Sequence, residues 1–215
     1  MKTRIITTTA VMLMALTGGI AQDFGLKAGV NYTTLSSDLE VDPSLGWHAG
    51  LLANFQITPQ FSLQPELLYS QEGATAFSEM EEEDLILSSE EKVTLSYLNL
   101  PVMLKFYPTQ GLSLNAGPQL GYVLKAENEY QISTDFGGAY FEESGTEDIT
   151  EEVKKFALGI NLGLAYDLTQ SFFLEARYHL GLTDIQDIDE EDEDFEMERE
   201  DIKNSGFQFY LGYRF

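Results

Sequence analysis

The last nine residues, 207–215, constrain the fold more than any other segment because apolar and polar positions alternate through them. Large apolar side chains occupy every odd position from Phe207 to Phe215, whereas Gln208 and Arg214 are among the residues at even positions. Successive side chains of a strand point to opposite faces of a sheet, whereas a helix repeats every 3.6 residues. The segment therefore predicts a β-strand with one apolar face and one mainly polar face.

Seven earlier segments repeat this alternation. They comprise residues 24–32, 45–57, 61–71, 93–107, 112–125, 156–167 and 172–182. Three connections are short, and these are residues 58–60, 108–111 and 169–171. Four are long, and these are residues 33–44, 71–92, 126–152 and 184–203. This layout predicts an all-β fold, an eight-stranded antiparallel up-and-down barrel with both termini at the end that carries the short turns.

The polarity of the two faces decides which kind of barrel to expect. The minor faces carry Gly, Asn, Gln, Lys and Glu, and aromatic residues gather at both ends of the segments. A soluble barrel such as a lipocalin has an apolar interior and a polar exterior, which is the reverse of this pattern. We therefore expect a transmembrane barrel with lipid outside, polar groups in the lumen and aromatic girdles at the two interfaces.

Two local features depart from the regular pattern. Apolar residues at 93, 95 and 97 fall out of phase with the apolar face of 98–106, which predicts a bulge near Tyr97 or a strand end above the lipid. Three prolines lie inside predicted strands, where they cannot donate a ladder hydrogen bond. They are Pro65, Pro101 and Pro118.

The N-terminal residues resemble a secretory signal. Lys2 and Arg4 form a basic start, an apolar run follows from Ala10 to Leu16, and small residues lead to Ala21. We expect cleavage before residue 22, so that 1–21 is a signal peptide and 22–215 is one barrel domain. The chain contains no cysteine, so its exported form must be stabilised by burial and hydrogen bonding rather than by disulfides.

The net charge of −24 is distributed unevenly. The four long connections hold 32 of the 36 acidic residues, which places the negative charge at one end of the barrel. Such acidity argues against nucleic acid as a partner, because phosphates require basic surfaces. Carboxylates suit Ca²⁺ or Mg²⁺, although a run of acids is more commonly a solvated, self-repelling loop. The weak candidates for metal ligands are Asp187, Asp189, Asp192 and Asp194.

Charged residues also recur on the faces that should line the lumen. An eight-stranded barrel has room inside only for side chains, so a network of paired charges is expected rather than an open pore. A narrow ion path is the alternative. The predicted network consists of Lys27, Glu66, Lys105, Lys125, Glu175, Arg177 and Arg214.

Catalysis and a cofactor are not expected. His48 and His179 are predicted to point into the lumen, but no further histidine or cysteine accompanies them at a metal-binding spacing. No serine lies in a convincing register with either histidine, so the nucleophile and base of a hydrolase are missing. Both histidines are therefore expected to be structural.

Four strand motifs resemble those of one known family. Residues 97–105, YLNLPVMLK, resemble the YLxIPLLLK strand of PorT-like outer-membrane β-barrel proteins. Residues 25–31, GLKAGVN, and 61–73, FSLQPELLYSQEG, are similar to their first strand and their ELlYsqkG strand. Residues 115–122, NAGPQLGY, resemble a further strand. The terminal Phe215 also resembles the aromatic signal that the barrel assembly machinery recognises.

The resemblance implies a fold and an outer-membrane location more than an activity. The leading expectation is a non-enzymatic surface or envelope protein, embedded in outer-membrane lipid, whose acidic loops contact ions, surface polysaccharide or a partner protein. The namesake of the family is tied to protein secretion, so a component of a secretion or transport assembly is the second hypothesis. A narrow ion channel is the third.

Overall fold

A computed structural model describes residues 22–36, 41–82, 85–136, 139–186 and 202–215. The predicted signal peptide and the four candidate metal ligands between 187 and 194 lie outside these residues. Within the described ranges there is no helix that is both long enough and apolar enough to cross a membrane.

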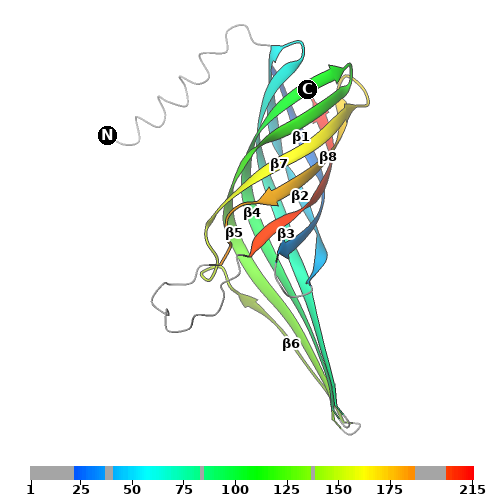
Figure 1. Ribbon diagram of the computed structural model, residues 1–215, viewed down its shortest axis with the longest axis vertical. Coiled ribbons are helices and arrows are strands. Elements are labelled where there is room, and N and C mark those ends of the chain that lie inside the picture. The colour runs from blue at the N-terminus through cyan, green and yellow to red at the C-terminus, as the bar shows by residue number, and fades with distance from the viewer. Residues whose placement is uncertain (1–21, 37–40, 83–84, 137–138, 187–201) are drawn as a thin grey trace, which may run out of the picture.

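The described residues form nine antiparallel strands, of which eight close into a ring (Figure 1). The ring order is β1, β2, β3, β4, β5, β7, β8 and β9, and β9 pairs with β1 to close it. The strands are β1 (Gln22–Ser36), β2 (Val41–Thr58), β3 (Phe61–Glu82), β4 (Leu85–Thr109), β5 (Leu112–Phe136), β6 (Ala139–Asp148), β7 (Phe156–Asp167), β8 (Phe172–Gly181) and β9 (Lys203–Arg214). The predicted eight-stranded barrel is confirmed, and β6 is an additional strand outside the ring.

The short turns have local chemical causes. Thr58 Oγ1 accepts hydrogen bonds from the backbone N–H groups of the second and third residues after it, and Thr169 Oγ1 does the same. Gly111, between β4 and β5, has a φ of 83°, a backbone angle that residues with a Cβ rarely adopt. The Phe215 N–H donates to Phe24 O, so the C-terminal residue lies beside the start of β1 at this end of the barrel (Figure 1).

The barrel is polar inside and apolar outside. Among the described residues, 23 of the buried side chains are polar or charged and only 14 are hydrophobic. On β7, Leu158 is 52% exposed and Leu162 is 57% exposed, whereas Asn161 between them is fully buried. This arrangement is unfavourable in water and favourable in a bilayer, which confirms the predicted orientation of the faces.

Aromatic pairs on neighbouring strands form two girdles. Near the short turns, Phe61 packs on Phe106 and Phe172 on Tyr213, with ring centroids 5.1 and 5.0 Å apart. At the other end the pairs are Trp47–Tyr69, Tyr122–Phe156 and Tyr178–Phe207. The ten residue steps from 156 to 166 on β7 span roughly 33 Å along the strand. A strand tilted by about 40° then covers about 25 Å of membrane normal, which matches the apolar band of such barrels.

The prolines interrupt the ladder without shifting its register. Between β3 and β4, pairing stops after Pro65–Val102 and resumes at Leu68–Asn99 in the same register. Between β4 and β5 it stops at Pro101 and resumes at Leu104. The cost of a missing donor is therefore confined to a few residues on each strand.

The irregularity expected near Tyr97 lies on the partner strand. Ser96 pairs with Lys125 and Tyr97 with Val123, so Leu124 is an extra residue in β5. β4 keeps its phase throughout, and Leu95 and Tyr97 point into the barrel. The bulge also overturns one prediction: beyond it the inward phase of β5 passes to Ala126, which leaves Lys125 exposed rather than in the lumen.

Beyond the aromatic girdle at the end opposite the short turns, part of the sheet continues as an extension that we call the blade. It consists of residues 77–82, 85–94, 127–136 and 139–148 of β3, β4, β5 and β6, and it forms the long tip of the molecule in Figure 1. The ten residues of β6 correspond to roughly 33 Å of extended chain. The long connections 71–92 and 126–152 were expected to be loops; instead much of each is strand.

Candidate functional site

Four of the predicted lumen charges meet at the centre of the barrel. This central charge cluster consists of Lys27 from β1, Glu66 from β3, and Glu175 and Arg177 from β8. Lys27 Nζ lies 2.8 Å from one oxygen of Glu66 and 3.3 Å from one oxygen of Glu175. All four side chains are fully shielded from solvent. Two cations thus neutralise two carboxylates across the lumen.

Neighbouring side chains satisfy the remaining hydrogen-bonding groups of the cluster. Gln64 Nε2 donates to Glu66 Oε1 over 2.7 Å, and Asn115 Nδ2 donates to Glu175 Oε1 over 3.0 Å. The Tyr210 ring covers the cations, with Lys27 Nζ 3.8 Å from its centroid. A buried cluster of this kind is stable only when each charge is paired and hydrogen-bonded, and here each one is.

Lys105 and Arg214 form a separate layer nearer the short turns. Lys105 Nζ donates to Gln64 Oε1 over 3.3 Å, and Arg214 Nη2 lies 2.9 Å from Asp167 Oδ1. The buried Phe173 ring lies between them, 5.5 Å from Lys105 Nζ and 4.5 Å from Arg214 Cζ. Six of the seven predicted network residues are thus in or at the edge of the lumen, and Lys125 is the exception.

The two histidines are held by asparagines. His48 Nδ1 lies 2.5 Å from Asn31 Oδ1, and His179 Nδ1 lies 3.0 Å from Asn161 Oδ1. Each ring is buried, and His48 also stacks on Tyr210 with centroids 3.9 Å apart. Within the described residues, no group of three or more histidine and acidic side chains is arranged to hold a metal ion.

An apolar cap closes the other end of the lumen. Val153 and Ile185, from the connections that follow β6 and β8, pack on side chains that point inward from the strands. Lys154 N donates to Ile185 O, and Val153 forms an isolated bridge with Gln186, so the two connections hold each other. The remaining members of the cap are Leu35, Ala74, Leu95, Tyr97, Val123 and Ala126. Between this cap and Phe173 lie the central charge cluster and the two histidine–asparagine pairs.

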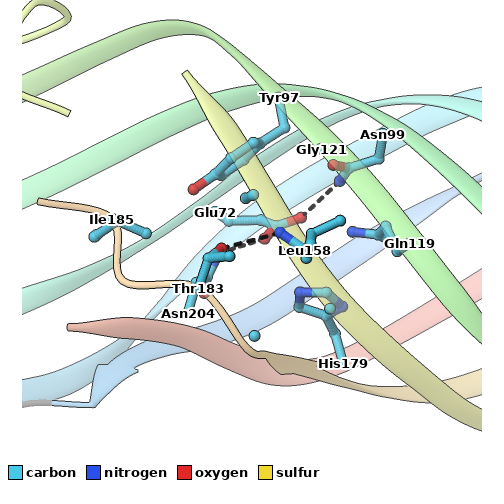
Figure 2. A pocket seen from close by; sticks show the side chains of 13 residues that line it. Glu72, Tyr97, Asn99, Gln119, Gly121, Leu158, His179, Thr183, Ile185 and Asn204 are labelled. Atoms are coloured by element: carbon cyan, nitrogen blue, oxygen red, sulfur yellow. Dashed lines mark hydrogen bonds between the residues drawn. The ribbon is translucent and has the colours of Figure 1, made fainter. Parts of the chain in front are cut away.

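One buried carboxylate lies apart from the central charge cluster. Glu72 on β3 is 3% exposed and borders a cavity of about 20 Å³ that the cap residues Tyr97 and Ile185 also line, as Figure 2 shows. It accepts hydrogen bonds from Ser70 Oγ, Asn99 Nδ2 and Asn204 Nδ2. The sequence analysis did not predict Glu72 as a lumen residue, because the third predicted strand stops at Gln71 and Glu72 falls in the long connection after it. The signal was present, since Glu72 continues the inward phase of Glu66 and Ser70.

The charged residues of the blade are almost all negative. Its 36 residues include 12 acids and one base, Lys92. Phe77, Tyr140 and Phe141 are more than half exposed, so aromatic groups stand among the acids. Two of its backbone edges are open among the described residues: β6 pairs only with β5, and β3 pairs with β2 only as far as Ala76.

Comparison with known proteins identifies the family. The family model for the outer membrane protein beta-barrel domain matches residues 20–187. No curated protein is significantly similar to the chain in sequence.

Several solved structures resemble the chain at low identity. Ail, the attachment invasion locus protein of Yersinia pestis, has 15% identity and a TM-score of 0.45, and the match covers 90% of this chain and 98% of Ail. Neisserial surface protein A has 14% identity and a TM-score of 0.43, with 91% and 99% covered. The outer membrane protein OprG from Pseudomonas aeruginosa has 12% identity and a TM-score of 0.38, with 93% and 98% covered.

Proposed function

The chain belongs to the outer membrane protein beta-barrel domain family, and from that premise we propose that it is a non-enzymatic surface protein that presents the acidic blade to a cationic partner. It is a protein of the cell outer membrane. The barrel would serve as a closed anchor and the blade as the recognition element. The observation that carries this proposal is the blade itself, a bare sheet with 12 acids, one base and open edges.

The filled lumen supports an anchor rather than a conduit. The central charge cluster, the Phe173 layer and the apolar cap lie one above another inside the ring. Hydrated ions would have to displace paired charges and apolar groups in turn to pass. We therefore propose that the barrel does not conduct, and that planar-bilayer recordings of the purified protein stay silent in both NaCl and KCl.

The edges and charge of the blade define the chemistry of the partner. An open strand edge offers a row of unpaired backbone donors and acceptors, which an extended segment satisfies by adding as a further strand. Glu142, Glu143 and Glu147 on β6 would attract a segment rich in Lys or Arg. We propose a basic, extended protein segment as the partner and the β6 edge as its site.

Site-specific photocrosslinking tests this proposal in cells. One probe replaces Ser144, which is exposed on β6, and a control probe replaces Gln60 in the short turn at the opposite end. A surface partner should crosslink at 144 and not at 60. The adduct should weaken when Glu142, Glu143 and Glu147 are changed to Gln, and in high salt. The proposal would be overturned if the yield of the adduct at 144 changed neither with the Glu→Gln substitutions nor with the salt concentration.

A place in a secretion assembly is the second candidate. The strand motif at 97–105 favours it, because that motif resembles PorT-like proteins, the branch to which we propose the chain belongs. Such an assembly would contact the end with the short turns, which faces the periplasm in barrels of this layout. The Gln60 probe therefore separates the two functions, since a stoichiometric adduct at 60 alone would favour the assembly.

A further inference from the structure

Glu72 is a buried carboxylate that forms no ion pair with a lysine or arginine among the described residues. The ion pairs of the lumen involve Glu66, Glu175 and Asp167, and none involves Glu72. Its three hydrogen-bond donors are a neutral hydroxyl and two neutral amides. A buried charge is costly unless an opposite charge compensates it, so this position calls for a positive group.

Two oxygens beside Glu72 also have few or no hydrogen-bond partners. Asn204 Oδ1 is buried without a hydrogen-bond partner, and the Tyr97 hydroxyl, also buried, has only the Asn204 side chain as a hydrogen-bonding neighbour; the two residues are 5% and 2% exposed. Both side chains line the same cavity as Glu72 and lie to one side of its carboxylate in Figure 2. Buried polar atoms are nearly always paired, so two atoms with so few partners on one cavity indicate a missing ligand.

The cavity has the size of a single small species. Its volume of about 20 Å³ exceeds the 10–15 Å³ that one water molecule requires, and it is far too small for an organic ligand. Its polar lining is mainly oxygen-bearing, and the oxygen-bearing residues are Glu72, Tyr97, Asn99, Gln119, Thr183 and Asn204. Oxygen atoms are the ligands that hard cations prefer.

We propose that the cavity bordered by Glu72, Tyr97 and Asn204 binds one hard cation, coordinated by the Glu72 carboxylate and neutral oxygens. A monovalent ion such as Na⁺ suits the site best, because one carboxylate neutralises one positive charge. A Ca²⁺ ion would leave a net positive charge in a buried position, and tight calcium sites hold more carboxylates than this one.

The position of the site gives the cation a structural role. Thr183 and Ile185 follow β8, whereas Asn204 lies at the start of β9, and all three border the cavity. The cation would therefore join the two ends of the long connection between β8 and β9, directly beneath the cap. The cavity lies level with the aromatic girdle opposite the short turns, since Asn204 is three residues from Phe207 and His179 is adjacent to Tyr178.

Unfolding of the full chain in detergent micelles provides the first test. Urea midpoints are measured at pH 8, where an ordinary histidine is neutral, with NaCl replaced stepwise by choline chloride at constant ionic strength. Choline is too large for the cavity. Above the dissociation constant, the folding equilibrium constant should rise in proportion to Na⁺ concentration, about tenfold per tenfold increase. A parallel titration with CaCl₂ separates the monovalent from the divalent ion.

Three variants assign the effect to the cavity. Glu72→Gln should abolish the Na⁺ dependence, and Tyr97→Phe should weaken the affinity several-fold while keeping the packing of the ring. Glu79→Gln, an exposed position on the same strand, should behave as the wild type. The proposal fails if the wild type shows no Na⁺ dependence, which means water alone fills the cavity. It also fails if Glu72→Gln keeps the full dependence.

A direct readout does not depend on stability. Thallium(I) is a monovalent ion with strong anomalous scattering, and crystals grown in thallium(I) acetate should show an anomalous peak within coordination distance of a Glu72 oxygen. The peak should be absent in Glu72→Gln. Peaks only on the acidic blade, with none in the cavity, would overturn the assignment.

Discussion

Arg177 and Glu66 form a two-pronged ion pair across the lumen, although 111 residues separate them in sequence. Arg177 Nη1 donates to Glu66 Oε2 over 3.1 Å, and Nη2 donates to Oε1 over 3.0 Å. The same guanidinium donates through Nη2 to Glu175 over 2.6 Å. The planar fork of arginine suits this double contact, which a lysine cannot reproduce.

Replacing Arg177 should be the most damaging single change in the lumen. Arg177→Met leaves Glu66 and Glu175 with only Lys27 between them, so one buried carboxylate loses its compensation. We expect a loss of about 3–5 kcal/mol in the free energy of unfolding, the usual cost of breaking a buried pair. Urea unfolding in micelles measures it, and Lys125→Met, which removes an exposed pair, should leave the unfolding midpoint almost unchanged. Equal losses would contradict the assigned role.

The blade should be dispensable for folding of the barrel. Phe77 and Glu90 are partners across β3 and β4, so an Asn-Gly turn can join them in place of residues 78–89. The same turn can join Ile132 to Glu143, which are partners across β5 and β6. Both deletions lie in the blade, outside the closed ring of eight strands. The shortened protein should therefore keep the heat-dependent gel shift of a folded barrel. Its crosslinks from the Ser144 probe should weaken, because the turn removes Glu142 and the first part of β6, and failure to fold would contradict the division into anchor and blade.

The barrel was predictable because its determinants are local. Alternation along each strand specifies the two faces, and the lumen charges follow from that phase, as Lys27 and Arg177 illustrate. Lys125 was misplaced because a single extra residue, Leu124, reverses the phase beyond it. A bulge depends on the register between two strands, so the alternation of residues along one strand does not predict where it occurs.

The cap and the blade depend on contacts between distant segments. From the sequence, Leu95 and Tyr97 indicate a break in phase, because a polar lumen is expected throughout. In fact the phase is kept, and the lumen itself becomes apolar where Val153 and Ile185 cover it. β6 was missed because an acidic segment with charges on both faces lacks the alternation that marks the lipid-facing strands.

A lipid-facing arginine should distinguish the membrane band from the blade. Leu162 lies midway along β7 and is 57% exposed on the outer face, so Leu162→Arg places a charge near the bilayer centre. We expect a loss of about 2–4 kcal/mol in folding into lipid vesicles, as for other barrels. Phe141→Arg is the control, because Phe141 is 65% exposed but lies on the blade, and it should change little. A similar cost at both positions would place the blade in lipid.

Asp184 should make the cap sensitive to strong acid. Although burial alone would raise its pKa, the N–H groups of Gln186 and Ile202 and the ammonium of Lys154 lower the pKa of this carboxyl below its ordinary value. Asp184 Oδ1 accepts both N–H groups over 3.1 Å. A carboxyl with a lowered pKa stabilises the folded state above the pKa of its unfolded form, about 3.9, and this contribution disappears as the pH falls through the lower folded value.

Hydrogen exchange at the two amides measures this dependence. At pH 6, the protection of the Gln186 and Ile202 amides should be several-fold greater in the wild type than in Asp184→Asn, because the variant cannot offer a charged acceptor. The difference should shrink as the pH falls through the lowered pKa of the carboxyl, because Asp184 is then protonated and neutral. The Tyr107 amide, which donates to Gln60 O at the opposite end, serves as the internal control. A difference between wild type and variant that stays unchanged from pH 6 down to the most acidic pH at which the barrel remains folded would show that the charge of Asp184 does not hold the cap.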